Sequence, residues 1–310
     1  MSESPKKRDP RNGLRMSASL ATVFTILGHT VFGFEQPVAQ VVVALATGYA
    51  CAFLFEWIDA RANGVKPGFA GGGFRKIVDF LLPAHMTSIT LSFLLYFGQR
   101  LWIMALTVAL ALGSKYVFRV RQNGRLQHFM NPSNFGIAVV LIVFQWTGVL
   151  PWNFTIDIHG VWDVVVPLAI LMLGTRLNLL FTGRIPTVMA WLGTFILLAI
   201  VRSGIRNTPL AADLVVLTGI PLVLFTFYMI TDPQTSPSRL KSQILFGGGI
   251  ACGYFLLLSL HVQYMMFYSV TIVCAMRGLA LFALNLRKPV VVPVPAPEPA
   301  AVAEVASQGV

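Results

Sequence analysis

Residues 36–57 read QPVAQVVVALATGYACAFLFEW, an apolar run long enough to cross a lipid bilayer as one helix. Similar runs recur along the 310-residue chain, which is 56% hydrophobic, 11% charged and has a mean hydropathy of +0.73. A soluble domain of this composition would have too little polar surface to cover its core. The sequence therefore predicts an integral membrane protein whose first partner is the lipid bilayer.

Ten spans are expected along the chain. Each is a mostly apolar stretch of roughly 17 to 23 residues, the length that crosses about 30 Å of hydrocarbon as a helix. Their approximate limits are 16–34, 36–57, 77–97, 100–118, 134–151, 161–181, 185–202, 211–230, 242–260 and 263–285. An even number of spans puts both termini on the same side of the membrane.

Positively charged residues indicate which side that is. The chain has 23 Lys and Arg residues and a net charge of +11, and most of these residues fall on the side of the amino terminus. The exceptions are Arg100, Arg202 and Arg206. Because cytoplasmic loops are enriched in Lys and Arg, both termini are expected in the cytoplasm. Orientation accounts for the charge, so nucleic acid is not expected as a partner.

Composition divides the chain into four parts. Residues 1–15 are a basic, uncleaved cytoplasmic leader, and residues 289–310 are a Pro- and Ala-rich tail that is expected to be disordered. Residues 16–151 and 161–288 hold five spans each, so the second half enters the membrane inverted relative to the first. The expected fold is all-α: a polytopic membrane protein with ten transmembrane helices in two inverted five-helix repeats.

Two spans at corresponding positions of the halves contain proline, Pro83 in the third and Pro221 in the eighth. Proline removes a backbone donor, so two broken or kinked helices could face each other and present their ends to an ion or polar ligand. The alternative is that the two prolines are unrelated and that each only kinks a packed helix.

Four ionisable residues at membrane depth are candidates for a transport or proton path, because burying a charge in hydrocarbon is costly. They are Asp79, His85, Asp213 and Arg277. The ordinary pKa of histidine suits His85 to carry a proton, and a hydrogen-bonded core histidine is the competing interpretation. Arg277 could instead extend to the membrane interface as an anchor.

Two polar loops interrupt the apolar sequence on the expected cytoplasmic face. Residues 129–136 read FMNPSNFG and residues 229–237 read MITDPQTSP, so each loop has an amide or an acid directly before proline. Asn131 and Ser133 have the residue types that cap the start of a helix, with Pro132 preset at its first position. Capping is therefore one explanation of this pattern.

A ligand site shared by the two loops is the other explanation. Four residues would form it: Lys115, Asn131, Thr231 and Asp232. Asp232 would then complement Arg239, Lys241 or Arg277 across the site. Lys115 opens a basic run that continues to Arg125 and could hold an anionic head group, although the enrichment of cytoplasmic loops in cations also explains this run.

Metal and disulfide chemistry are not expected. Cys51, Cys252 and Cys274 lie inside apolar stretches without metal-binding or pairing spacing, which is typical of small buried hydrophobic residues. The chain also lacks a cysteine cluster for iron and sulfur and a histidine pair for haem.

Three motifs resemble a known superfamily. Lys115-x-x-Phe118, His128-Phe129-x-Asn131-Pro132 and Thr231-Asp232-Pro233 match, in order and spacing, the membrane subunits designated D in Rnf-type electron-transport complexes and B in sodium-pumping NADH:quinone oxidoreductase, the NqrB/RnfD superfamily. A branch of enediyne-biosynthesis membrane proteins (UnbU-like) is more similar still. The stretches that resemble this branch are 81–85, 113–138, 181–186 and 225–233.

The resemblance covers most of the chain and implies the same ten-helix inverted-repeat fold. It also implies a bacterial cytoplasmic (inner) membrane location, redox protein subunits as partners, and a role in electron transport or ion movement with a link to natural-product biosynthesis. The residues Lys115, Asn131, Thr231 and Asp232 would then bind a cofactor.

One departure from the superfamily concerns this cofactor. The Rnf and quinone-reductase subunits carry a flavin esterified to threonine in a Ser-Gly-Ala-Thr motif on the external loop after the fifth span. Here residues 146–160 read WTGVLPWNFTIDIHG, and neither Thr147 nor Thr155 lies in such a motif. Covalent flavin is therefore not expected. The cofactors still compatible with the resemblance are a noncovalent flavin (FMN or riboflavin) and a quinone.

Three hypotheses for function follow. The first is a membrane electron-transfer component that binds flavin or quinone noncovalently. The second is a transporter or channel for a small solute or ion, with its site between the two repeats. The third is a nonenzymatic scaffold or export accessory of a biosynthetic pathway. We favour the first, and the sequence does not decide whether the protein is an enzyme.

Overall fold

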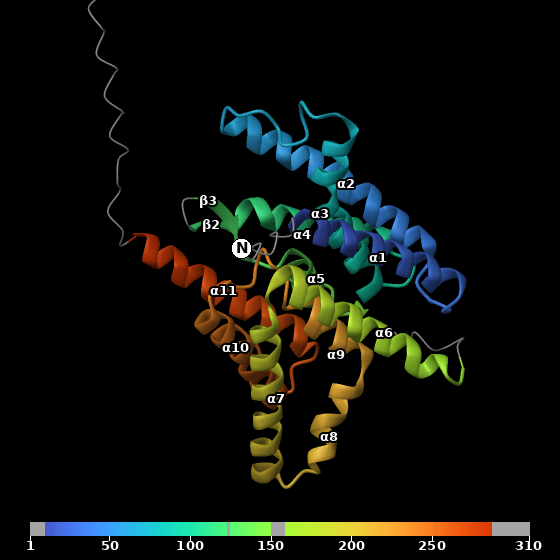
Figure 1. Cartoon of the computed structure of the whole chain (residues 1–310), viewed down its shortest axis with the longest axis vertical. Coiled ribbons are helices and arrows are strands. Elements are labelled where there is room, and N and C mark those ends of the chain that lie inside the picture. The colour runs from blue at the N-terminus through green and yellow to red at the C-terminus, as the bar shows by residue number, and fades with distance from the viewer. Residues whose placement is uncertain (1–9, 123–124, 150–158, 287–310) are drawn as a thin grey trace, which may run out of the picture.

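The computed structural model describes residues 10–122, 125–149 and 159–286. Helices dominate this part of the chain, and the first half lies above the second in Figure 1. The helices of the first half are α1 (Pro10–Thr30), α2 (Val38–Ala62), α3 (Gly73–Leu94), α4 (Leu101–Val117) and α5 (Pro132–Val143). Of the expected leader, residues 10–15 belong to α1 and the rest lie outside the described residues. The expected tail, residues 289–310, lies wholly outside them.

The second half contains longer and shorter helices. They are α6 (Trp162–Leu177), the π-helix η1 (Asn178–Thr182), α7 (Ile185–Arg206), α8 (Leu210–Leu214), the 3-10 helix η2 (Val215–Thr218), α9 (Ile220–Leu224), the π-helix η3 (Phe225–Met229), α10 (Leu240–Ser259) and α11 (Met265–Leu286). Two antiparallel ribbons complete the described fold. They pair β1 (Leu95–Tyr96) with β4 (Gly148–Val149) and β2 (Arg119–Gln122) with β3 (Arg125–His128).

Length and composition identify the helices that can cross a membrane. Within the described residues, α2, α3, α6 with η1, α7, α10 and α11 pass on both counts, and a bent pair of short helices over 210–229 makes a seventh candidate. The helices α4 and α5 are apolar but shorter, with 17 and 12 residues. The prediction of an all-α, multi-pass membrane protein is confirmed at this level.

The limits of two expected spans were wrong. The fifth was expected over 134–151, but α5 ends at Val143 and residues 148–149 pair with β1. Apolar residues alternate with Gln145, Thr147 and Gly148 after Val143, so hydropathy gives no sharp stop there. The eighth was expected as one span over 211–230, and its two parts are bent by 69° at the break that precedes Pro221.

The two proline-containing spans therefore differ. Gly219 has an extended backbone (φ −79°, ψ 136°), and Pro221 lies in the first turn of α9, where its missing N–H is tolerated. Pro83 instead lies inside α3, which continues without a break from Gly73 to Leu94. Of the two expected broken helices, only the eighth span is broken.

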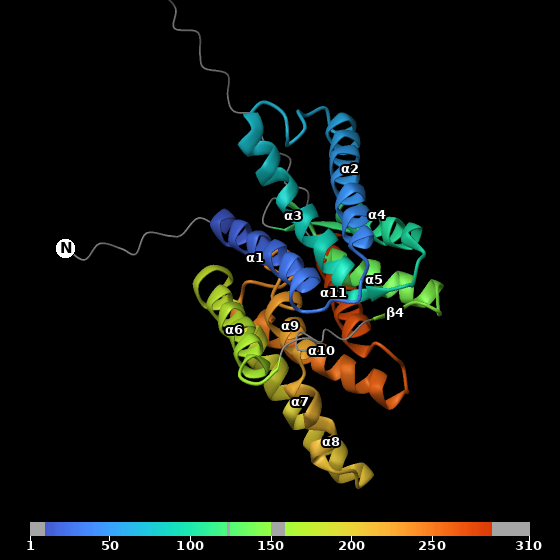
Figure 2. The ribbon, with the colours of Figure 1, turned by 90° about the vertical axis from the view of Figure 1, so that its right-hand side faces the viewer.

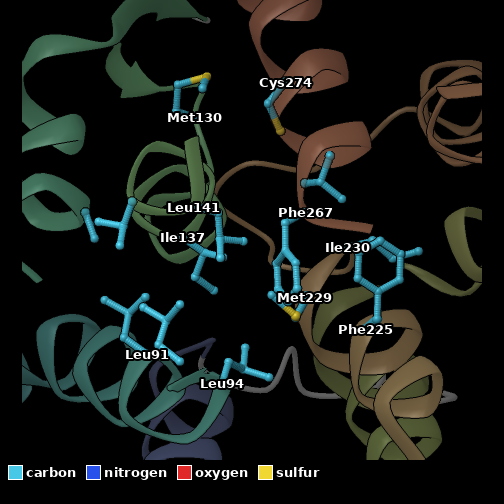
Figure 3. Close-up of a cluster of buried hydrophobic side chains, with 14 of the residues drawn as sticks. Leu91, Leu94, Met130, Ile137, Leu141, Phe225, Met229, Ile230, Phe267 and Cys274 are labelled. Atoms are coloured by element: carbon cyan, nitrogen blue, oxygen red, sulfur yellow. The ribbon is translucent and has the colours of Figure 1, made fainter. Parts of the chain in front are cut away.

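The largest hydrophobic cluster joins the two halves. Figure 3 shows side chains of α3, α5, η3 and α11 meeting in it. Its labelled members include Leu91, Leu94, Ile137, Leu141, Phe225, Met229 and Phe267. Since α5 and η3 begin and end at the two polar loops, this cluster fixes where those loops lie.

Candidate functional site

A cavity of about 550 Å³ lies where the two halves meet. Its walls come from α1, α3, α6 with η1, and α9 with η3, and Figure 2 shows α1 and α6 on the same flank of the molecule. Most of the lining is apolar, and the residues that give it this character include Leu14, Leu20, Phe24, Ile89, Phe93, Leu94, Ile170, Phe181, Leu224 and Tyr228. Pro83 and the broken eighth span both border this space, as two facing proline-containing helices were expected to do.

One end of the cavity is polar, and both polar loops contribute to it. Its lining there consists of Lys115, Asn131, Ser133, Thr231, Asp232 and Gln234, which we call the polar end. The structure thus brings together all four residues expected to form a shared ligand site. A space with apolar walls and a polar end of this kind suits a ligand with an apolar body and a polar head.

Asn131 connects the two loops. Its Oδ1 accepts hydrogen bonds from Asn134 N (3.2 Å) and Ser133 Oγ (3.0 Å), which caps the start of α5. Its Nδ2 donates to the carbonyl of Met229 at 3.2 Å, 98 residues further along the chain. Asn131 is only 5% exposed. The capping explanation is therefore correct for Asn131, and the same amide also holds the second loop in place.

The second loop, residues 231–236, folds around Asp232 and is called the Asp232 loop below. The Asp232 carboxylate accepts from Gln234 N (3.2 Å) and from Thr235 Oγ1 (2.9 Å), and its carbonyl accepts from Ser236 Oγ (2.6 Å). These bonds make a compact turn of the type that Asp favours. Among the described residues Asp232 forms no ion pair, so it does not bind Arg239, Lys241 or Arg277 directly as expected.

Two arginines from other parts of the chain donate hydrogen bonds to the Asp232 loop. Arg184, at the start of α7, donates to Ser236 Oγ (2.8 Å) and to the carbonyls of Pro233 and Ser236 (3.2 Å each). Arg277 of α11 donates to the Thr235 carbonyl at 2.9 Å. Arg277 thus acts as a support of the loop, which neither the anchor nor the transport interpretation anticipated.

Arg184 was missed as a site residue. It is 7% exposed, and burial lowers the pKa of its guanidinium while the negative charge of Asp232 acts in the opposite direction. The only sequence signal was its place in the stretch 181–186, which resembles the UnbU-like branch. Hydropathy cannot reveal an arginine whose role is to bind backbone carbonyls of a distant loop.

His128 lies beside the same charges. Burial lowers its pKa to about 4, and the positive charges of Lys115 and Arg119 act in the same direction, while Asp232 opposes them. Its Nε2 is buried without a hydrogen-bond partner among the described residues. His128 is therefore neutral at physiological pH and adds no charge to the polar end.

Asp79 and His85 belong to helix-packing interactions in the first half. Asp79 forms a two-pronged ion pair with Arg15 of α1, with N···O distances of 2.8 and 2.6 Å. Both ring nitrogens of His85 are bonded, Nδ1 with Tyr49 OH at 2.7 Å and Nε2 with Thr22 Oγ1 at 2.8 Å. His85 thereby links α1, α2 and α3, as a satisfied core histidine does.

Asp213 lies apart from these residues. It forms an ion pair with Arg202, at the end of α7 that meets α8, and both figures show α8 far from α3. The four residues expected to line one transport path thus take part in four separate sets of interactions. No His, Cys, Asp or Glu residues in the described ranges cluster closely enough to hold a metal ion.

No protein-family model matches the chain, and no curated protein matches it significantly.

Proposed function

We propose that the protein is an integral membrane component of an electron-transport system and that it binds a flavin or a quinone noncovalently in the cavity. The cavity itself is the observation that carries this proposal: its walls are apolar, and the two loops with the superfamily-like motifs supply its polar end. Flat redox cofactors need both features, an apolar slot for the rings and a few fixed polar groups at one edge.

The residues present fit such a cofactor. Asn131, Thr231 and Asp232 place polar atoms in the lining, Lys115 offers a cation, and Tyr228 and Phe93 offer aromatic surface along the walls. A flavin or quinone would supply the redox chemistry, while these side chains would bind it, orient it and exclude water. Covalent attachment is not part of the proposal, because Thr147 is buried and donates to the Phe144 carbonyl, and Thr155 lies outside the described residues.

The proposed setting is a bacterial cytoplasmic membrane, with both termini in the cytoplasm and ten spans in two inverted repeats. Matching packing partners in the two halves support the repeat: α2 packs on α4 as α7 packs on α10, α4 on α5 as α10 on α11, and α1 on α3 as α6 on α9. In this orientation the polar end faces the cytoplasm, where redox protein partners would reach it.

One observation favours a second candidate, a transporter for a small solute or ion. The eighth span is broken, and its second part borders the cavity, an arrangement that transporters use at their binding sites. Against it, Asp79, His85 and Asp213 are engaged in separate local interactions. The site geometry therefore favours a bound cofactor over a transport path.

Absorption spectra of the purified protein test the proposal. A visible flavin band, or quinone in an organic extract, at about one molecule per chain is the expected result. The flavin should be released by denaturation, and the denatured band on a gel should not fluoresce, because attachment is noncovalent. Colourless, quinone-free protein that moves solute into liposomes would reject the proposal in favour of the transporter.

Replacing Asp232 separates the site from the fold. Asp232→Asn keeps an acceptor for Gln234 N and a hydrogen-bonding group for Thr235 Oγ1, so stability should change by less than about 1 kcal/mol. It replaces one carboxylate oxygen of the polar end with an amide nitrogen, so a cofactor N–H or O–H bonded to this oxygen would lose its acceptor, and cofactor content or activity should fall by more than half. Asp163→Asn, at an exposed position of α6, is the matched control. Equal loss of folded protein and activity in Asp232→Asn would indicate a purely structural role.

A further inference from the structure

Lys115 is a cation at the polar end without a protein partner. It lies in the last turn of α4, is half-buried and borders the cavity. Among the described residues, its ammonium forms no hydrogen bond and no ion pair. Its neighbour Arg119 contrasts with it, because Arg119 donates to Asp59 Oδ1 and to the Lys115 carbonyl, both at 2.8 Å.

A role for this ammonium in ending α4 does not account for its position. Cations near helix C-termini can bond the last free carbonyls. Here two of those carbonyls have other donors: Phe118 N donates to Ser114 O, and Arg119 Nε donates to Lys115 O. The Lys115 ammonium is therefore available to bind a ligand in the cavity.

The nearby carboxylate does not neutralise the surrounding charge. Asp232 attracts Lys115 electrostatically, yet it is too far away for an ion pair, and its oxygens are bonded within its own loop. Arg184 and Arg277 add two further positive charges next to the same loop. Three positive charges thus surround one negative charge in a largely buried region, where an uncompensated charge is unfavourable.

We infer that the ligand of the cavity is an amphiphile with an anionic head group, that Lys115 binds this head group, and that the apolar walls hold the rest of the molecule. The inference rests on the site of the proposed function and adds the charge of its ligand, so among the proposed cofactors it selects the phosphorylated flavin, FMN, over riboflavin and a quinone. It does not depend on redox chemistry, because any amphiphile with a phosphate, carboxylate or comparable anion meets the same requirements.

Three simple probes test the inference on the purified full chain in nonionic detergent, with binding followed by native mass spectrometry. Dodecyl phosphate should bind one molecule per chain at least about 10-fold more tightly than dodecanol, since a charge-assisted hydrogen bond contributes at least this much. Inorganic phosphate should compete weakly, because it has no apolar body. Equal affinity of the two dodecyl compounds would overturn the inference, and strong competition by inorganic phosphate would show an anion site without a role for the walls.

Variants assign the head group to Lys115. Lys115→Gln should weaken dodecyl phosphate binding about 10-fold or more and leave dodecanol binding unchanged, while Lys115→Arg should restore the preference. Lys241→Gln removes the same charge at an exposed position of α10 and should change neither affinity. Unchanged dodecyl phosphate binding in Lys115→Gln would refute the assignment. The comparison of dodecyl phosphate with dodecanol uses the unmodified chain, so it remains valid if a variant fails to fold. Purified protein without flavin and quinone would reject the proposed function, and the outcome of this comparison would not change.

Discussion

Replacing Asn131 with alanine tests whether one amide holds both loops of the site. The change removes the α5 cap, worth about 1 kcal/mol. It also leaves the Met229 carbonyl without its donor in a residue that is 8% exposed, which costs about 1 to 3 kcal/mol. The expected loss in the free energy of unfolding is therefore about 2 to 4 kcal/mol.

Reversible unfolding by urea in micelles of a nonionic detergent measures this loss. Asn131→Asp keeps the acceptor that caps α5 but cannot donate to Met229 O, so its loss should be smaller than that of Asn131→Ala. Asn63→Ala is the control, because Asn63 donates to the Asp59 carbonyl at an exposed position and its removal should cost less than about 0.5 kcal/mol.

The three values together decide the point. If Asn131→Ala lost less than about 1 kcal/mol, the bond between the loops would contribute nothing measurable and the shared site would need another cause. If Asn131→Asp matched the unmodified protein, Asn131 would act only as a helix cap.

Two further measurements probe the surroundings of the site. Gly278→Ala places a methyl group against the ring of Phe129 and should lower the free energy of unfolding by about 1 to 3 kcal/mol. Gly193→Ala is the control: nothing lies near its new methyl group, so the change should be neutral or stabilising. Similar losses in the two variants would contradict this packing. The second is pH dependence. The pKa of His128 is about 4 in the folded protein and ordinarily 6.5, so the unfolded chain takes up a proton first as pH falls. Stability present above pH 6.5 should decline between about 6.5 and 4, by up to about 3 kcal/mol. His128→Gln should remove this part of the decline, and an unchanged pH profile would refute it.

Hydropathy predicts the helices well where length and lipid exposure alone define them. The expected span 185–202 corresponds to Ile185–Arg206, and 242–260 corresponds to Leu240–Ser259. It fails where apolar residues recur after the helix has ended, as Phe144, Trp146 and Val149 do after Val143. The missing information there is tertiary, because pairing of β4 with β1 draws the backbone out of the helix.

The polar loops correctly indicated where part of the cavity lining lies. Asn131 and Asp232 were expected to meet because both loops lie on one face at the mouths of apolar helices, and both border the cavity. The ionisable residues at membrane depth do not meet at one place, since Asp79 and Asp213 each pair with a different arginine that spacing in the sequence does not reveal. A cost of burial indicates that a partner exists, and it does not indicate which one.

The hydrogen bonds of Arg184 and Arg277 connect two different helices to the Asp232 loop, which borders the cavity. Arg184 belongs to the start of α7 and Arg277 to α11, and both bind backbone carbonyls between Pro233 and Ser236. If a ligand ordered this loop, it would also restrain the ends of α7 and α11 that hold it, and by thermodynamic reciprocity any change that displaced either arginine would alter the affinity for that ligand.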